Sequence, residues 1–255
     1  MASEPTHRSR ATTGPVPARR DDVPRLVARV TGDETLGKAA RAQALRALAV
    51  ALAASARAAG VAAVASGRWL TDQVVDLAPR IPVRDLPTLR AHHEGLTGDE
   101  LAERLITHAG RVTGAIGAAG GAIASVEFAA PPLLLSAPVQ LLAETIAVVA
   151  VELKLVAELH VVYGRTPPGN VASRANAYVT AWARRRGLDR SNPAGLVGVL
   201  GGAVRREVRQ RLMRRAGRNV TTFAPFFTGA VAGAELNRRE TRHLGDALVT
   251  DLRRR

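Results

Sequence analysis

The chain contains no cysteine, few aromatic residues and almost no lysine. The absence of cysteine excludes disulfide bonds, thiolate metal sites and a cysteine nucleophile. Aromatic residues make up only 3% of the 255 residues, so the core must be built from Ala, Val and Leu, with Gly permitting close backbone approach. Sheet-rich domains usually carry more aromatic and β-branched residues. The composition therefore favours packed helices.

The short motifs of common enzymes are also missing. No G-x-S-x-G, no G-x-x-x-x-G-K-[ST] and no H-E-x-x-H occurs in the sequence. His92, His93 and Glu94 are neighbours in the sequence and point to different faces, and no second set of ligands is spaced to complete a metal site. We therefore expect a non-enzymatic protein with no catalytic residue, metal ion or cofactor.

Charge of one sign dominates the sequence. The formal net charge is +14, and all but two of the 36 basic residues, Lys38 and Lys154, are arginines. A positive field of this size attracts polyanions such as lipid headgroups or nucleic acid. Arg, Ala, Gly and Pro also share GC-rich codons, so genome composition is a second explanation, and both stay open. Residues 1–22 lack the apolar run of a signal peptide and are predicted to form a disordered basic tail before a helical domain at 23–255.

Helix signals follow one another along the rest of the chain. Thr31–Glu34 and Thr97–Glu100 have the spacing of capping boxes, and the first predicts a helix that continues to about Val64. A connector with a short helix is expected at 81–96, and a break near Pro131. Further helices are predicted at 69–78, 137–163, 171–186, 193–215 and 223–252. With no convincing strand, the sequence predicts an all-α, bundle-like single domain.

The centre of the chain is a glycine-rich apolar tract at 112–164. It holds two uncharged windows of 15 and 16 residues on either side of Glu127, each short of the roughly 20 residues that span a bilayer. We interpret the tract as a helical hairpin that is either a packed core or partly inserted in a membrane. Basic residues flank both ends of this hairpin, which would keep both ends in the cytoplasm. They are Arg104, Arg111, Lys154 and Arg165.

Glycines four residues apart accompany the tract. Each such pair lies on one face of a helix, where it lets a neighbouring backbone approach closely, in membranes or in a tight soluble bundle. The pairs are Gly110/Gly114, Gly117/Gly121, Gly198/Gly202 and Gly229/Gly233.

Acidic residues in the second arm of the hairpin are candidate site residues. Glu144 and Glu158 lie near one face of the predicted helix, and Glu152 points about 80° away from Glu144. Acids in so apolar a segment need a partner or water. The partner is either an Arg or a helix end from the carboxyl half, or else the acids line a polar cleft for a headgroup, a cation or a polar ligand.

Two motifs carry a resemblance to a known family. A glycine-rich helix, a proline-marked turn and a long helix ending in Tyr163-Gly164 follow one another, with Glu144 about five turns before that end. Near the carboxyl end come Gly229, Gly233, Asn237 and Gly245. In these features the chain resembles the EcsC family over about residues 101–252. The resemblance implies a bacterial, helical, membrane-associated protein without an assigned reaction, and it adds Asn237 to Glu144 and Glu158 as candidate ligand-binding residues.

A basic helix is expected around residues 204–218, with an apolar stripe at Val204, Val208 and Leu212. Arginines beside this stripe are candidates for contact with an anionic membrane surface. They are Arg205, Arg206, Arg209, Arg211, Arg214 and Arg215.

Together these features predict an accessory or scaffold protein. Its expected partners are an anionic lipid surface and a membrane protein. It would lie in the cytoplasm, peripheral to or partly inserted in the inner face of the cell membrane. The alternative is a soluble helical carrier with an apolar cavity for a lipid or another amphipathic ligand near Glu144. A more remote alternative is nucleic-acid binding, for which the chain lacks a helix-turn-helix cue and interleaved aromatic residues. The oligomeric state stays open.

Overall fold

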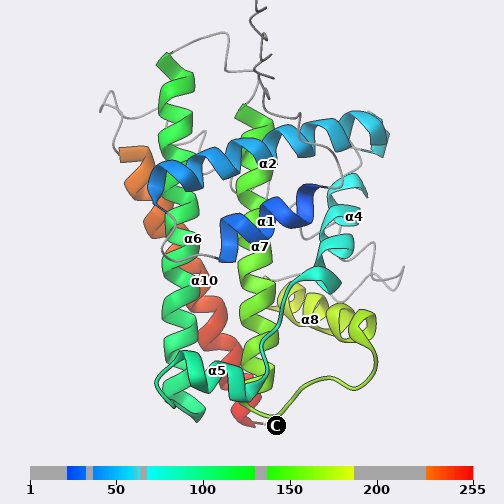
Figure 1. The fold of residues 1–255 in the computed structure, drawn as a ribbon, viewed down its shortest axis with the longest axis vertical. Helices are drawn as coiled ribbons and strands as arrows, with labels where there is room; N and C mark the ends of the chain where they lie inside the picture. Colours follow the sequence, from blue (N-terminus) through cyan, green and yellow to red (C-terminus); the bar gives the residue numbers. More distant parts are fainter. Residues whose placement is uncertain are drawn as a thin grey trace, which may run out of the picture.

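A computed structural model describes residues 22–32, 37–60, 62–63, 68–129, 137–186 and 228–254 of the chain. Within these residues there are eight α-helices, one 3-10 turn and no strand, which confirms the all-α fold (Figure 1). The elements are α1 (Val23–Gly32), α2 (Lys38–Ala59), α4 (Arg68–Leu77), η2 (Ala78–Arg80), α5 (Leu86–His92), α6 (Gly98–Ala129), α7 (Ala137–Val162), α8 (Val171–Arg185) and α10 (Thr228–Arg254).

Most helix boundaries follow local signals that the sequence displays. α7 ends at a glycine in the left-handed region, Gly164, with φ of 62°. The N–H of Arg165 donates to the His160 carbonyl at 2.8 Å, and the N–H of Gly164 donates to the Val161 carbonyl at 3.1 Å. This pair of bonds is the Schellman cap, which satisfies carbonyls at the end of a helix. The expected helix at 193–215 lies outside the described residues.

The expected capping box at Thr31–Glu34 is wrong. α1 already begins at Val23 and runs through Thr31, whose hydroxyl donates to the Val27 carbonyl at 2.9 Å. α2 begins only at Lys38, after Gly37. The buried residues Val23, Val27 and Val30 have helical spacing, and this periodicity was the signal for α1 that the polar Thr31–Glu34 sequence obscured.

α7 is the central helix of the domain. Every residue from Ala143 to Leu159 is buried except the half-buried Lys154. The helix contacts α1, α2, α4, α6, α8 and α10. A helix that is apolar on all sides requires this kind of enclosure. None of the helices in the described ranges is both long enough and apolar enough to cross a bilayer.

Glycines bring α6 and α10 into close, antiparallel contact. A Cβ added to Gly117 would lie 2.5 Å from the Gly233 carbonyl oxygen, and one added to Gly245 would lie 2.6 Å from Ile106 Cγ1. Gly114 lies against the backbone of Ala234 in the same way. The close helix approach that the glycine spacing predicts therefore occurs here between two helices of one chain.

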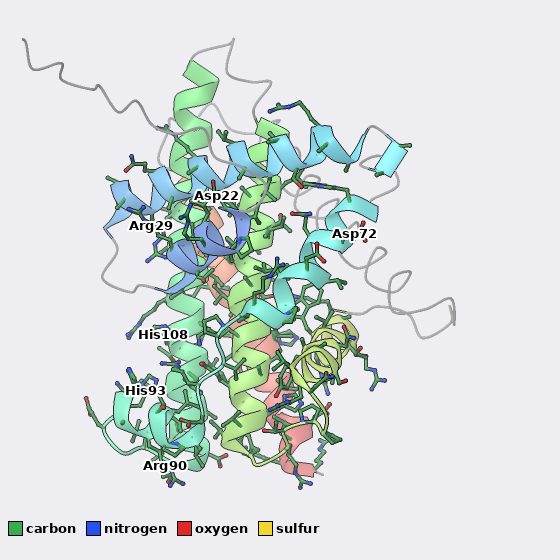
Figure 2. The ribbon with its side chains drawn as sticks, turned by 45° about the vertical axis from the view of Figure 1, so that its right-hand side comes forward. Asp22, Arg29, Asp72, Arg90, His93 and His108 are labelled. Atoms are coloured by element: carbon green, nitrogen blue, oxygen red, sulfur yellow. The ribbon has the colours of Figure 1, made fainter. Side chains whose placement is uncertain are left out.

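The hairpin of α6 and α7 has an inner and an outer part. In the inner part, 112–120 on α6 and 142–159 on α7, the side chains lie in or against the core, including the fully buried Ile116 and Ala143. The outer ends of both helices extend beyond α2, which crosses them (Figures 1 and 2). Packed core is therefore the correct interpretation for the inner part of the tract.

Candidate functional site

α7 carries three buried carboxylates that face different neighbours. Glu144 contacts α10, Glu152 contacts α8 and α10, and Glu158 contacts the segment before α5. At 1.5 Å per residue, Glu144 and Glu158 are about 21 Å apart along the helix axis. The two acids that the sequence placed near one face thus belong to separate clusters.

Glu144 lies in a polar contact between α6, α7 and α10. Its side chain is buried, and the Asn237 amide donates to Glu144 Oε1 at 3.3 Å and to the Thr113 carbonyl at 3.2 Å. The Thr113 hydroxyl in turn donates to the Asn237 carbonyl at 3.3 Å. The structure therefore brings together Glu144 and Asn237, two candidate residues that are 93 positions apart in the sequence.

Glycines provide the space that this polar contact fills. A Cβ on Gly120 would overlap the Glu144 carboxylate, and a Cβ on Gly117 would come within 2.7 Å of the Asn237 amide nitrogen. The carboxylate and the amide occupy the volume that side chains would take at these two positions. Thr113, Glu144 and Asn237, which form this contact, are all buried.

Glu152 is the most deeply buried of the three acids, with 1% of its surface exposed. It forms an ion pair with Arg186, which follows α8 and also pairs with Glu240 at 2.8 Å. The Trp182 indole N–H donates to Glu152 Oε2 at 2.8 Å, and the Thr241 hydroxyl donates to Oε1 at 3.1 Å. This network ties α7 to α8 and α10.

Sequence reasoning missed this network. Trp182 and Arg186 are one helical turn apart, so they face the same direction. That spacing was a usable signal that an acid lies opposite them, but it did not say which of the three acids.

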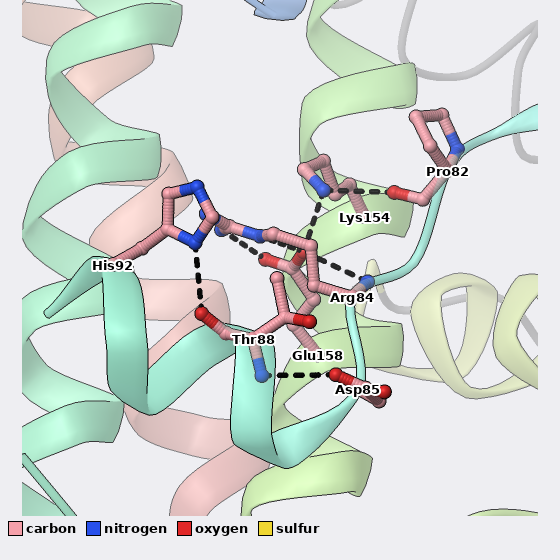
Figure 3. A network of polar contacts seen from close by, with 7 residues as sticks. All are labelled: Pro82, Arg84, Asp85, Thr88, His92, Lys154 and Glu158. Atoms are coloured by element: carbon pink, nitrogen blue, oxygen red, sulfur yellow. Dashed lines mark hydrogen bonds and ion pairs between the residues drawn. The ribbon is translucent and has the colours of Figure 1, made fainter. Parts of the chain in front are cut away.

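Glu158 is held by two cations (Figure 3). Arg84 makes a bidentate contact, with Nε 2.8 Å from Oε1 and Nη2 2.9 Å from Oε2. Lys154 Nζ lies 2.5 Å from Oε1 and donates to the Pro82 carbonyl at 2.8 Å. Burial raises the pKa of the Glu158 carboxyl, but the two cations lower it more, so the pKa lies below its usual value.

The same cluster positions the start of α5. Asp85 is the N-cap and accepts the backbone N–H of Thr88 at 2.9 Å; hydrogen bonding to the Thr88 side chain, followed by this backbone bond, lowers the pKa of its carboxyl. Burial, followed by the nearby Arg84, lowers the pKa of His93. Across the described part of the chain, no three His, Asp or Glu side chains are arranged to hold a metal ion.

A further polar contact lies where α6 begins and α7 ends. The Tyr163 hydroxyl donates to Asp99 Oδ1 at 2.6 Å, and Arg253 Nη2 lies 2.9 Å from the same oxygen. These hydrogen bonds lower the pKa of the Asp99 carboxyl. The contact joins the end of α7 to the start of α6 and the end of α10.

An open groove of about 950 Å³ lies beside this contact, between α6 and α10. Its lining combines acidic, basic and apolar side chains, so the groove has no clear preference for an anion or a cation. The lining includes Leu96, Asp99, Glu103, Arg104, Ile106 and Arg253.

The arginines proposed as anionic-surface contacts, Arg205 to Arg215, lie outside the described residues. No family model, curated protein or solved structure matches the chain. The geometry of the helices is therefore the basis on which a function is argued.

Proposed function

We propose that the protein is a non-enzymatic, membrane-associated accessory protein of the EcsC-like type. It docks at the inner face of the cell membrane through the outer end of the α6–α7 hairpin. The observation that carries this proposal is the extension of both helices beyond α2 (Figure 1), at the end of the hairpin where Glu127 is the single charged residue.

The charge distribution along the hairpin supports docking at that end. Between Arg111 and Glu144 the sequence has a single charged residue, Glu127, and it includes three consecutive leucines at 133–135. Burial of one leucine side chain away from water contributes about 1.5–3 kcal/mol. Since no described helix is suited to cross a bilayer, the proposal is shallow insertion of the hairpin end.

The positions of the motif residues support the EcsC-like assignment. Glu144 and Asn237, which come from the two separate motifs, are hydrogen-bonded to each other. Tyr163 and Gly164 end α7 and fasten it to Asp99. The motifs thus act together in one helical unit, as motifs of a single family would.

The carrier alternative receives less support from the same region. The Asn237 amide fills the space beside Gly117, and the Glu144 carboxylate fills the space beside Gly120. A lipid cavity at this place would require these contacts to open.

Liposome flotation at low salt tests the proposal. We expect the intact protein to float with vesicles that contain anionic phospholipid. The double variant Leu133→Glu with Leu135→Glu should reduce the bound fraction at least about ten-fold, since two buried leucines are replaced by charges. Val83→Glu with Val171→Glu is the matched control, because it adds the same two charges at exposed apolar residues, before α5 and at the start of α8.

Three results would contradict the proposal. One is failure of the intact protein to float with either anionic or neutral vesicles. The second is equal flotation of the leucine variant and the intact protein. The third is recovery of the protein, without detergent, in the soluble fraction together with co-purified lipid, which would favour the carrier instead.

A further inference from the structure

α2 is a cationic helix without a single acid. Its sequence contains Lys38, Arg41, Arg46 and Arg57, and the whole stretch from Thr35 to Thr71 has no Asp or Glu. The described acids of the domain lie elsewhere, on α4, α6, α7 and α10 and in the segments beside α1 and α5. α2 therefore contributes positive charge that no acid on the same helix compensates.

The charges of α2 are divided between an inner and an outer face. Leu45, Leu48 and Leu52 face the core and are fully buried. Arg41 is also buried, where its guanidinium donates to the Val30 carbonyl at 2.5 Å. The inner face of α2 therefore packs in the core and binds α1.

The outer face of α2 is exposed and carries both charge and apolar surface. Arg46 and Arg57 are exposed on this face, three turns apart, and Val50 lies between them with 54% of its surface exposed. Alanines fill much of the remaining surface. A small apolar face between two arginines is the pattern of a helix that lies along a membrane surface.

The position of α2 places this face near the proposed docking end. α2 crosses α6 and α7 just below the point where their outer ends extend beyond it (Figures 1 and 2). A membrane reached by the end of the hairpin therefore passes close to α2. Arginine forms bidentate hydrogen bonds with phosphate and can place its apolar stem on the surface while its charge contacts the headgroup.

We propose that the outer face of α2 is a second membrane contact, in which Arg46 and Arg57 bind the phosphate groups of anionic lipids and Val50 lies at the interface. This inference rests on the proposed function, since it assigns the electrostatic part of the same docking to a specific helix. The hairpin end supplies apolar insertion, and α2 supplies the preference for anionic lipid.

The absence of cysteine makes a site-specific test direct, because a single introduced thiol is the only one in the chain. Val50→Cys and, as control, Val171→Cys are each labelled with an environment-sensitive fluorophore. Both parent residues are exposed, at 54% and 60%. With phosphatidylglycerol vesicles at low salt, we expect the label at position 50 to shift to the blue and brighten, and the label at position 171 to stay unchanged.

Charge removal gives the second readout. Arg46→Gln with Arg57→Gln should weaken binding to anionic vesicles about thirty-fold, and it should flatten the decrease of binding with rising salt. The matched control is Arg90→Gln with Arg165→Gln, which removes the same charge from exposed residues of α5 and of the segment after α7 (Figure 2). This control should bind nearly as the intact protein does.

The outcomes separate this inference from the proposed function. If the intact protein floats and the leucine variant does not, but the label at position 50 is silent and the Arg46/Arg57 variant binds normally, the α2 contact is overturned and hairpin docking stands. If the intact protein binds no vesicles, both fall. If the Arg46/Arg57 variant loses binding to duplex DNA while the label ignores vesicles, α2 is a nucleic-acid surface and the lipid assignment is wrong.

Discussion

The inner and outer parts of the α6–α7 hairpin are built from similar residues but differ in position, since the inner part lies in the core and the outer part extends beyond α2. In the inner part, apolar side chains surround Glu144, Glu152 and Glu158, and each acid has a hydrogen-bond or ion-pair partner from another segment. The outer part extends beyond α2 and has Glu127 as its single charge. The buried acids of α7 thus lie where neighbouring side chains supply donors. Low charge alone therefore did not distinguish the packed core from the end of the hairpin that we propose as a docking surface.

The largest expected effect in the inner part is the loss of Glu152. Glu152→Ala leaves Arg186 without its buried partner and should lower the free energy of unfolding by about 3–5 kcal/mol. Urea unfolding followed by circular dichroism measures this. Glu240→Ala, which removes the more exposed partner of the same arginine, should cost less than about 1 kcal/mol. Equal losses of unfolding free energy in both variants would mean that the buried Glu152–Arg186 pair contributes no more to stability than the Glu240–Arg186 pair.

The next effect concerns the close approach of α6 and α10. Gly117→Ala places a methyl group against the Gly233 carbonyl and should destabilise the fold by about 1–3 kcal/mol. In Gly110→Ala the new methyl group meets the flexible side chain of Arg242, so this control should be neutral or slightly stabilising. Thermal melts of the two variants compare them directly. A Gly117→Ala protein as stable as the control would show that the helices are less closely packed.

A smaller effect is expected for the Glu144 contact. A double-mutant cycle of Glu144→Ala and Asn237→Ala should give a coupling energy of about 1 kcal/mol, as expected for one buried hydrogen bond. Chemical unfolding of the four proteins provides the energies. If the two changes in unfolding free energy are strictly additive, Glu144 and Asn237 do not act as a pair. A large loss of bound lipid with unchanged stability would instead favour the carrier alternative.

The pH dependence of stability tests how much the ion pairs of Glu158 stabilise the fold. Its pKa is lower in the folded protein than the value of about 4.3 in an unfolded chain, so its ionisation stabilises the fold above that pH. This contribution disappears as the pH falls through the folded pKa. The difference in Tm between the intact protein and Glu158→Gln should therefore shrink from pH 6 to pH 3. Glu100→Gln, at an exposed position, should show little difference at either pH.

The smallest expected effect on stability is in the outer part. Leu133→Glu with Leu135→Glu should change the free energy of unfolding by less than about 0.5 kcal/mol, as substitutions outside a core do. The same variant is expected to lose vesicle binding. A destabilisation comparable to that of Glu152→Ala would place these leucines in the core and end the distinction between the two parts.

Local patterns predicted much of the fold and little of the site. Apolar periodicity and Gly164 gave the two helices of the hairpin and the end of α7 correctly, since these signals act within a few residues. The break expected near Pro131 lies outside the described residues. The same reasoning missed α1, because the polar residues after Val30 resembled a helix start. The contacts of Glu144 with Asn237 and of Glu152 with Arg186 join residues 93 and 34 positions apart, and no local pattern contains such distances.

α1 is held to the domain by three buried valines and one guanidinium. A ten-residue helix is too short to be stable alone in water, and Arg41 binds a carbonyl near its carboxyl end, where the helix dipole favours a cation. We therefore expect α1 to undock at a lower free energy than the whole fold opens, so that its amide hydrogens exchange with solvent before those of α7. The amide hydrogens of α1 should thus report local opening, and those of α7 should report opening of the whole fold.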